Sequence, residues 1–130
     1  MIYLDSSALL KLLFEENESV PLARWISERA ATPMVSSELA RIEVVRAARR
    51  LDPTVVPAAR LLVAQLDLVP LTGGLIDAAA DAGEPILRTL DAIHLASVLS
   101  IEADLTAFVA YDTHLIADAA AAGIEAVRPS

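Results

Sequence analysis

Two aspartates follow directly after short apolar stretches that are typical of buried strands. Asp5 comes after Met1–Leu4, and Asp112 comes after Phe108–Tyr111. In an open parallel sheet, functional sites lie beyond the carboxyl ends of the strands, where both carboxylates would stand. An aspartate between a strand and a helix can also act only as an N-cap, accepting hydrogen bonds from the first amides of the helix. The positions therefore indicate either site residues or caps.

Two further acids lie in helical segments with apolar neighbours. Asp91 opens the most apolar helical stretch of the chain, Asp-Ala-Ile-His-Leu-Ala-Ser-Val-Leu, where the helix dipole favours a carboxylate. Burial without a partner would cost several kcal/mol or force protonation, and a bound cation would relieve that cost. Glu43 could instead form an ion pair with Arg46, three residues later. The predicted helix face of Glu43 is otherwise apolar and consists of Ala40, Val44, Ala47, Ala48 and Leu51.

Carboxylates that meet in one place repel one another and therefore favour a cation. At about 5 Å and an effective dielectric constant of about 20, each ionised pair repels by roughly 3 kcal/mol. Oxygen ligands without sulfur favour Mg²⁺, with Mn²⁺ as a substitute, and the chain has no cysteine. His94 and His114 are too few and too separated for a zinc site, and we expect His94 to pack inside or to support a ligand. Such a site suits phosphoryl or phosphodiester transfer.

The elements that must position these acids are short apolar strands that alternate with helices. This alternation predicts an α/β fold in three layers, with a short, mostly parallel sheet of about five strands flanked by helices. Pro70 makes the third strand short or places it at an edge. The predicted strands are 1–4, 34–36, 68–71, 108–111 and 125–127. The predicted helices are 6–14, 20–31, 38–51, 55–66, the segment between Gly74 and Gly83, 90–101 and 113–122.

Length, composition and charge limit the class of protein. The chain has 130 residues, of which 55 % are hydrophobic, and its 18 acids against ten Lys and Arg give a formal charge of −8. The length suits one domain, 1–130, and the composition argues against disorder. The longest uncharged stretch, Ala92–Ile101, is too short to cross a bilayer, and no signal peptide is visible, so we expect a cytoplasmic protein without membrane contact. Evenly spread negative charge would argue against nucleic acid, but acidity gathered in one metal site would not.

Four segments together resemble a PIN domain, specifically the VapC type of toxin ribonuclease. The first two are Ile2-Tyr-Leu-Asp5-Ser-Ser-Ala-Leu and Ser37-Glu-Leu-Ala-Arg-Ile-Glu43-Val-Val-Arg46-Ala. The other two are Leu87-Arg-Thr-Leu-Asp91-Ala-Ile-His-Leu-Ala96 and Tyr111-Asp112-Thr-His-Leu, with Ala119-Ala-Ala-Ala-Gly123 downstream. The segments span the chain in the family's order, and Leu-Asp-Ala-Ile-His-Leu-Ala is the most specific.

The resemblance implies a PIN-like fold and an Mg²⁺-dependent endoribonuclease acting on RNA, usually tRNA or rRNA. The family's four catalytic acids carry over to Asp5, Glu43, Asp91 and Asp112, of which Asp5, Asp91 and Asp112 would bind the metal. Glu38 lies on the same predicted helix as Glu43, which is preferred because it shares the apolar face.

Two small polar residues match those that accompany the first and fourth acids of the family, namely Ser7 and Thr113. A further acid of the family can fall just after Asp112, where this chain has Thr113 and His114. The resemblance therefore does not carry over a fully acidic second metal site.

The resemblance also implies a homodimer and a cognate VapB-like antitoxin, which would place an Arg in the acidic pocket and a helix in a groove. Arg suits that pocket because its planar fork matches carboxylates. Candidates for lining the groove or the dimer contact are Leu9, Leu12, Leu13 and Trp25. Ordinary core packing is the more common role of such side chains.

Basic residues gather on the predicted helix of Glu43. They are Arg41, Arg46, Arg49 and Arg50, with Arg60 as a further candidate. They could hold RNA phosphates. A solvated helix face with local ion pairs accounts for the same residues comparably well.

Two other functions stay open at this point. A PIN fold could serve as a binding protein without turnover, although four intact acids argue against it. A receiver-like signalling module phosphorylated on an aspartate fits the length and the strand-end carboxylates. It needs a Lys at a strand end, however, and the single Lys, Lys11, falls in the first predicted helix.

Overall fold

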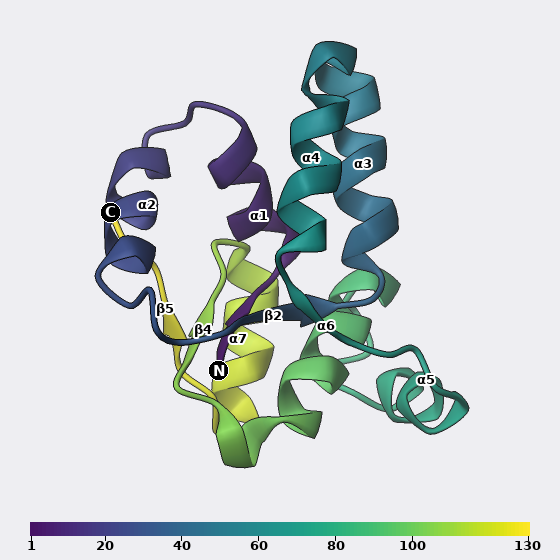
Figure 1. Cartoon of the computed structure of the whole chain (residues 1–130). Helices are drawn as coiled ribbons and strands as arrows, with labels where there is room; N and C mark the ends of the chain where they lie inside the picture. Colours follow the sequence, from purple (N-terminus) through teal and green to yellow (C-terminus); the bar gives the residue numbers. More distant parts are fainter.

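Five short strands form one parallel sheet in the order β3-β2-β1-β4-β5. The structure, a computed structural model, describes all 130 residues (Figure 1). The strands are β1 (Ile2–Leu4), β2 (Met34–Ser37), β3 (Asp67–Val69), β4 (Ala107–Val109) and β5 (Ala126–Val127). The predicted α/β class and the five-stranded sheet are confirmed, and every strand pair is parallel. β3 lies at an edge, as Pro70 predicted.

Seven helices and two short 3₁₀ segments connect the strands. The helices are α1 (Ser6–Leu13), α2 (Ser19–Ser27), α3 (Ala40–Leu51), α4 (Val56–Ala64), α5 (Gly73–Ala80), α6 (Thr89–Ser100) and α7 (Thr113–Ala121). The 3₁₀ segments are Pro53–Val55 and Glu102–Asp104. None of the helices has the length and hydropathy that a membrane crossing would require.

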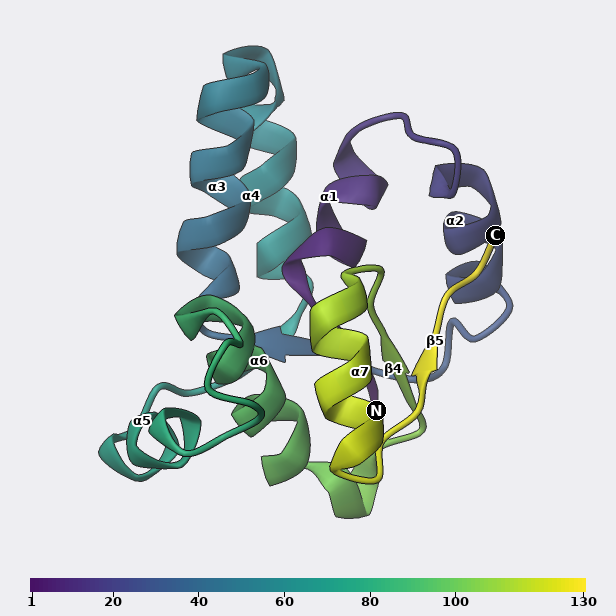
Figure 2. The same cartoon turned by 180° about the vertical axis from the view of Figure 1, so that it is seen from behind.

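The alternation of side chains along β1 divides the core into two layers. Ile2 and Leu4 pack with α1, α2, α3 and α4, whereas Tyr3 packs with α5, α6 and α7 on the opposite face. Successive side chains of a strand point to opposite faces, so a strand that is buried on both faces is apolar throughout. The helices lie accordingly in two groups, and α3 and α4 extend side by side beyond the sheet (Figure 1 and Figure 2). The three layers are thus as predicted.

The strand order places a topological switch point between β1 and β4. From β1 the chain goes to β2 and β3 on one side, and later it fills β4 and β5 on the other side. Crossovers that leave in opposite directions open a crevice at the carboxyl ends of the two central strands. Asp5 directly follows β1, and Asp112 follows β4 and precedes α7.

Several predicted helix boundaries were wrong by two to four residues. α2 ends at Ser27, and the exposed Ala30 and Ala31 lie in a turn because they have no core to contact. α3 begins at Ala40, since the Ser37 hydroxyl bonds the Leu39 amide in a turn that precedes the helix. The predicted stop of α7 at Gly123 is correct, and Gly123 adopts φ +92°, a conformation that L side chains rarely take.

Candidate active site

Asp5 is the most deeply buried of the four acids. Its side chain caps α1: Oδ1 accepts hydrogen bonds from the Ser7 hydroxyl at 2.7 Å and from the Ala8 amide at 3.0 Å. Asp5 is 2 % exposed, and burial raises its pKa to about 6. The hydrogen bonds from Ser7 and Ala8 oppose that rise, whereas the charge of Asp91 adds to it. The cap therefore uses one oxygen of a carboxylate whose ionisation is made unfavourable by burial.

Asp112 is the corresponding cap of α7. Its Oδ1 accepts a hydrogen bond of 2.9 Å from the Leu115 amide. The interpretation as helix caps is thus confirmed for both strand-end aspartates. It does not exclude a catalytic role, because the bonds of Asp5 and Asp112 all go to Oδ1 and leave each Oδ2 available.

The Asp91 side chain has no hydrogen bond or ion pair within the chain, although it is half-buried in the first turn of α6. Its pKa is raised chiefly by burial and then by the negative charge of Asp112, with Glu43 adding to the rise. His94 and Arg88 act in the opposite direction without contacting it. α6 is largely apolar, as predicted, but the groups that act on the Asp91 carboxylate are charged, and none of them forms an ion pair with it.

Glu43 lies in the first turn of α3 and contacts a histidine from α6. Glu43 Oε1 is 2.7 Å from His94 Nε2, and the Glu43 side chain is 14 % exposed. The alternative ion pair with Arg46 is absent. Glu38, the other acid of the predicted helix, lies outside α3 in the preceding turn.

His94 is fully buried and is held on its other side by a residue that the sequence did not reveal. Tyr3 Oη lies 2.7 Å from His94 Nδ1. His94 matches the predicted interior or supporting role. Tyr3 was missed because it lies within an apolar strand, and nothing in its sequence neighbourhood distinguishes it from a core aromatic.

The four carboxylates influence one another through Asp91. The charge of Asp91 raises the pKa of Asp5, and the charges of Asp112 and Glu43 raise the pKa of Asp91. A divalent cation would relieve this repulsion, and the donors are all carboxylate oxygens, which Mg²⁺ and Mn²⁺ prefer.

The spacing of these donors limits how a cation could be held. No three His, Asp or Glu side chains are grouped closely enough to ligate one metal ion. The arrangement still fits Mg²⁺, which typically binds through one or two carboxylates and keeps several waters.

Ser7 connects the first acid to the strand beside it. Its hydroxyl donates to Asp5 and accepts a hydrogen bond of 3.0 Å from the Tyr111 amide. Thr113 is exposed at the start of α7, and no hydrogen bond joins its side chain to an acid. Of the two predicted supporting residues, Ser7 therefore has contacts to the acids and Thr113 has none.

The basic residues of α3 separate into two groups. Arg46, Arg49 and Arg50 alone line a hollow of about 330 Å³. Arg41 and Arg60 line another hollow of about 390 Å³, together with apolar residues of α3, α4 and β3. None of the five forms an ion pair, which is contrary to the alternative of a face with local ion pairs.

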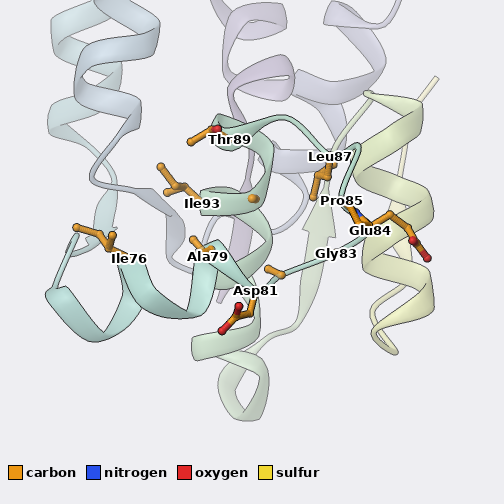
Figure 3. Close-up of a pocket in the computed structure, with 12 residues that line it drawn as sticks. Ile76, Ala79, Asp81, Gly83, Glu84, Pro85, Leu87, Thr89 and Ile93 are labelled. Atoms are coloured by element: carbon orange, nitrogen blue, oxygen red, sulfur yellow. The ribbon is translucent and has the colours of Figure 1, made fainter.

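A larger cavity of about 580 Å³ lies between α5, the loop after it and the start of α6 (Figure 3). Ile76, Thr89 and Ile93 are among its lining residues, and Asp81 and Glu84 are its acids. None of the four candidate acids lines it, so this cavity lies beside the candidate site and is not part of it.

The candidate groove residues and the single lysine all have contacts within the chain. Leu9 is fully buried, and Leu12, Leu13 and Trp25 are partly buried against the core on the α1–α4 side. Lys11 lies 3.0 Å from Glu18 and over the ring of Tyr111. It is therefore engaged away from the aspartates, and the receiver-like alternative lacks its lysine.

Comparison with known proteins places the chain in a family. The family model described as "PIN domain" matches residues 2–122. Ribonuclease VapC47 of Mycobacterium tuberculosis (strain CDC 1551 / Oshkosh) is 39 % identical over 132 residues, which cover 99 % of this chain and 97 % of that protein. Ribonuclease VapC35 of M. tuberculosis (strain H37Rv) is 40 % identical over 131 residues, with the same coverage.

A solved structure shares the architecture. The crystal structure of M. tuberculosis VapC20, described as a sarcin-ricin loop cleaving toxin, aligns with a TM-score of 0.75 and covers 99 % of this chain and 100 % of that chain. The identity is 20 %, so this likeness shows the fold alone.

Proposed function

The chain belongs to the PIN-domain family, among its VapC-type ribonucleases, and on that premise we propose that it hydrolyses RNA phosphodiester bonds with Mg²⁺ at a site formed by Asp5, Glu43, Asp91 and Asp112. Mn²⁺ would substitute for Mg²⁺ because the donors are the same hard oxygens. The product would be a cleaved RNA strand. The biological role of the protein would be that of a toxin.

The unpartnered state of Asp91 is the observation that carries this proposal. A half-buried carboxylate near three other acids has a raised pKa and no hydrogen bond or ion pair. Such a group is costly unless something outside the chain compensates it. A divalent cation does so, and the same carboxylates then serve the reaction instead of destabilising the fold.

The metal ion would be held by Asp5, Asp91 and Asp112, directly or through water. Once bound, it would neutralise the charge that develops on the phosphate and make a water more acidic. Ser7 and the Ala8 amide fix the orientation of Asp5, and the Leu115 amide fixes that of Asp112. Both aspartates are thereby oriented before any ligand arrives.

We assign Glu43 the role of accepting the proton of the attacking water. The oxygen of the water bonds to phosphorus, the bond from phosphorus to the leaving ribose oxygen breaks, and that oxygen takes a proton from solvent. The proton of the attacking water must be accepted. Oε1 of Glu43 is engaged by His94, so Oε2 is the atom available as acceptor.

The arginines of α3 are proposed to hold the RNA backbone. Arg46, Arg49 and Arg50 are unpaired and lie on the same helix as Glu43, with Arg49 about 9 Å further along the helix axis than Glu43. Arg41 lies nearer to Glu43 in sequence and is the fourth candidate. The substrate class we propose is structured RNA, tRNA or rRNA.

We propose that the same four acids also bind a protein partner. We propose a cognate VapB-like antitoxin that inserts an Arg among the four carboxylates, because a guanidinium satisfies them as a cation does. We further propose that the chain forms a homodimer and acts in the cytoplasm, where its RNA substrates are found. Leu12, Leu13 and Trp25 are only partly buried and are the candidates of this chain for the antitoxin groove.

Cleavage of purified tRNA and rRNA with and without Mg²⁺ tests the proposal. Asp5→Asn, Asp91→Asn and Asp112→Asn should each abolish most of the cleavage while the protein stays folded. The matched control is Asp77→Asn, which changes an exposed aspartate of α5. Undiminished cleavage in all three variants, or equal cleavage in excess chelator, would show that the site lies elsewhere.

A further inference from the structure

A buried hydrogen-bonded chain runs from the centre of the sheet to the candidate active site. Tyr3 Oη lies 2.7 Å from His94 Nδ1, and His94 Nε2 lies 2.7 Å from Glu43 Oε1. The three residues come from β1, α6 and α3, so the contacts connect three separate elements. Tyr3 and His94 are completely buried, and Glu43 alone reaches the surface.

We propose that His94 is a positioning residue of the ribonuclease, which orients Glu43 by donating from Nε2 to Oε1 while Tyr3 fixes the ring by donating to Nδ1. The inference rests on the proposed role of Glu43, through which His94 would act. Nothing in it requires His94 to touch RNA or metal.

The groups on either side of the imidazole set the direction of the two hydrogen bonds: the Glu43 carboxylate accepts and the Tyr3 phenol donates. An ionised carboxylate accepts only, so the proton between Glu43 and His94 belongs to Nε2. The Tyr3 phenol has an O–H that can donate, and it lies within hydrogen-bond distance of Nδ1. The neutral ring with its proton on Nε2 satisfies both neighbours.

Packing holds the histidine ring as firmly as the hydrogen bonds do. The rings of Tyr3 and His94 meet edge to face, with centroids 5.9 Å apart, and Phe108 packs against Tyr3 at the same centroid distance. A glutamate side chain has several rotatable bonds, and an unanchored carboxylate would sample many positions. Its anchoring by a buried imidazole leaves Oε2 in one place for the reaction.

The arrangement has the form of a carboxylate held by an outer hydrogen-bond partner. Loss of such a partner typically reduces activity or metal affinity by about 10- to 100-fold. The interaction with His94 also explains why Glu43 lies on an apolar helix face without an Arg partner. The apolar residues of that face pack with α1 and α4, and the Glu43 side chain reaches His94 of α6.

Nuclear magnetic resonance of the imidazole nitrogens tests the hydrogen bonds without any activity measurement. The chain has two histidines, and a His114→Gln variant leaves His94 as the single imidazole. We expect a proton on Nε2 alone at neutral pH, and a change of the Nδ1 signal in Tyr3→Phe. A proton on Nδ1, with or without one on Nε2, would overturn the assigned direction of the two hydrogen bonds.

A matched pair of variants tests whether His94 acts through Glu43. The amide nitrogen of His94→Gln can replace Nε2 as donor, whereas His94→Asn reaches only the Nδ1 position and faces Tyr3. We expect His94→Asn to lower the cleavage rate by about 10- to 100-fold and His94→Gln to restore part of it. Thermal melting of both proteins verifies that they are folded.

The same pair in a Glu43→Gln background separates positioning from folding. If His94 works through Glu43, His94→Asn should cause no further loss of cleavage there. An equal loss in both backgrounds would overturn the inference and leave the proposed function standing. Unchanged cleavage in Glu43→Gln alone would overturn the assigned role of Glu43, whatever the imidazole resonances show.

Discussion

The Ser7 hydroxyl lies 2.7 Å from Asp5 Oδ1, and it also accepts a hydrogen bond of 3.0 Å from the Tyr111 amide. One small side chain thus connects the residue after β1 to the segment after β4, across the switch point of the sheet. Ser7 therefore helps to orient the first acid and connects the segments that follow the two central strands.

Ser7→Ala should therefore weaken both stability and catalysis. The variant leaves the Tyr111 amide without its acceptor and removes one donor from Asp5, which should cost about 1–3 kcal/mol of unfolding free energy. The pKa of Asp5 should rise, because the Ser7 hydrogen bond lowers it. Chemical denaturation and RNA cleavage rates measure the two effects. Ser6→Ala is the matched control, since no hydrogen bond is formed by the Ser6 side chain, and an equal loss in both variants would contradict this role of Ser7.

Asp5 should make the metal-free protein less stable as the pH rises. Its pKa is about 6 in the folded chain against about 3.9 in an unfolded one, so between these values the folded state binds more protons. The contribution of Asp5 to unfolding free energy therefore falls by about 2 kcal/mol from pH 4 to pH 7.

Asp5→Asn should remove this dependence. In chelator, the variant should gain stability relative to the wild type as the pH rises, by the amount that the wild type loses. Asp77→Asn should follow the wild type at every pH because Asp77 is exposed. Parallel pH curves for the wild type and Asp5→Asn would show that Asp5 ionises normally.

The sequence predicted those parts of the molecule that repeat along the chain or that interrupt a pattern. Apolar strands that alternate with helices predicted the sheet, and Pro70 predicted its edge. The acids were predicted to form a site because they lie at strand ends or on apolar faces. Asp91, an acid opening an apolar helix, was the clearest of them.

What the sequence could not predict are the contacts between distant elements. Tyr3 and His94 are 91 residues apart, and the tyrosine in an apolar strand gave no sign of a polar partner. Glu43 could be assigned to Arg46 or to a site because a helix wheel does not say what faces it. The end of α2 was misplaced for a related reason: Ala30 and Ala31 have good helix propensity, but the core ends before them.

Mg²⁺ and Mn²⁺ should stabilise the folded chain. A ligand that binds only the folded state, at a concentration one hundred times its dissociation constant, adds about 2.7 kcal/mol. For a domain of this size that is a rise in melting temperature of roughly 10 °C. The rise should be much smaller in Asp91→Asn and unchanged in Asp77→Asn. An equal rise in all three proteins would place the binding site away from Asp91.

The arginines at the outer end of α3 should set the salt dependence of RNA binding. Each phosphate contact that is lost lowers the slope of log affinity against log salt by about one. The double variant Arg49→Ala/Arg50→Ala, made in the cleavage-deficient Asp91→Asn background, should lower it by about two. Arg24→Ala, on the exposed face of α2, is the control. An unchanged slope in the double variant would show that these arginines do not contact RNA phosphates. Their position would then be explained by the helix dipole alone, which favours basic residues at the end of a helix.

The most direct test of a ribonuclease site built on these acids is to sequence RNA ends after expression of the chain without an antitoxin. The wild type should generate new ends at a few recurrent positions in tRNA or rRNA. Asp91→Asn, expressed to the same level, should generate none of them. The same ends at the same frequency in both would contradict the assignment of cleavage to Asp91 and the three acids around it.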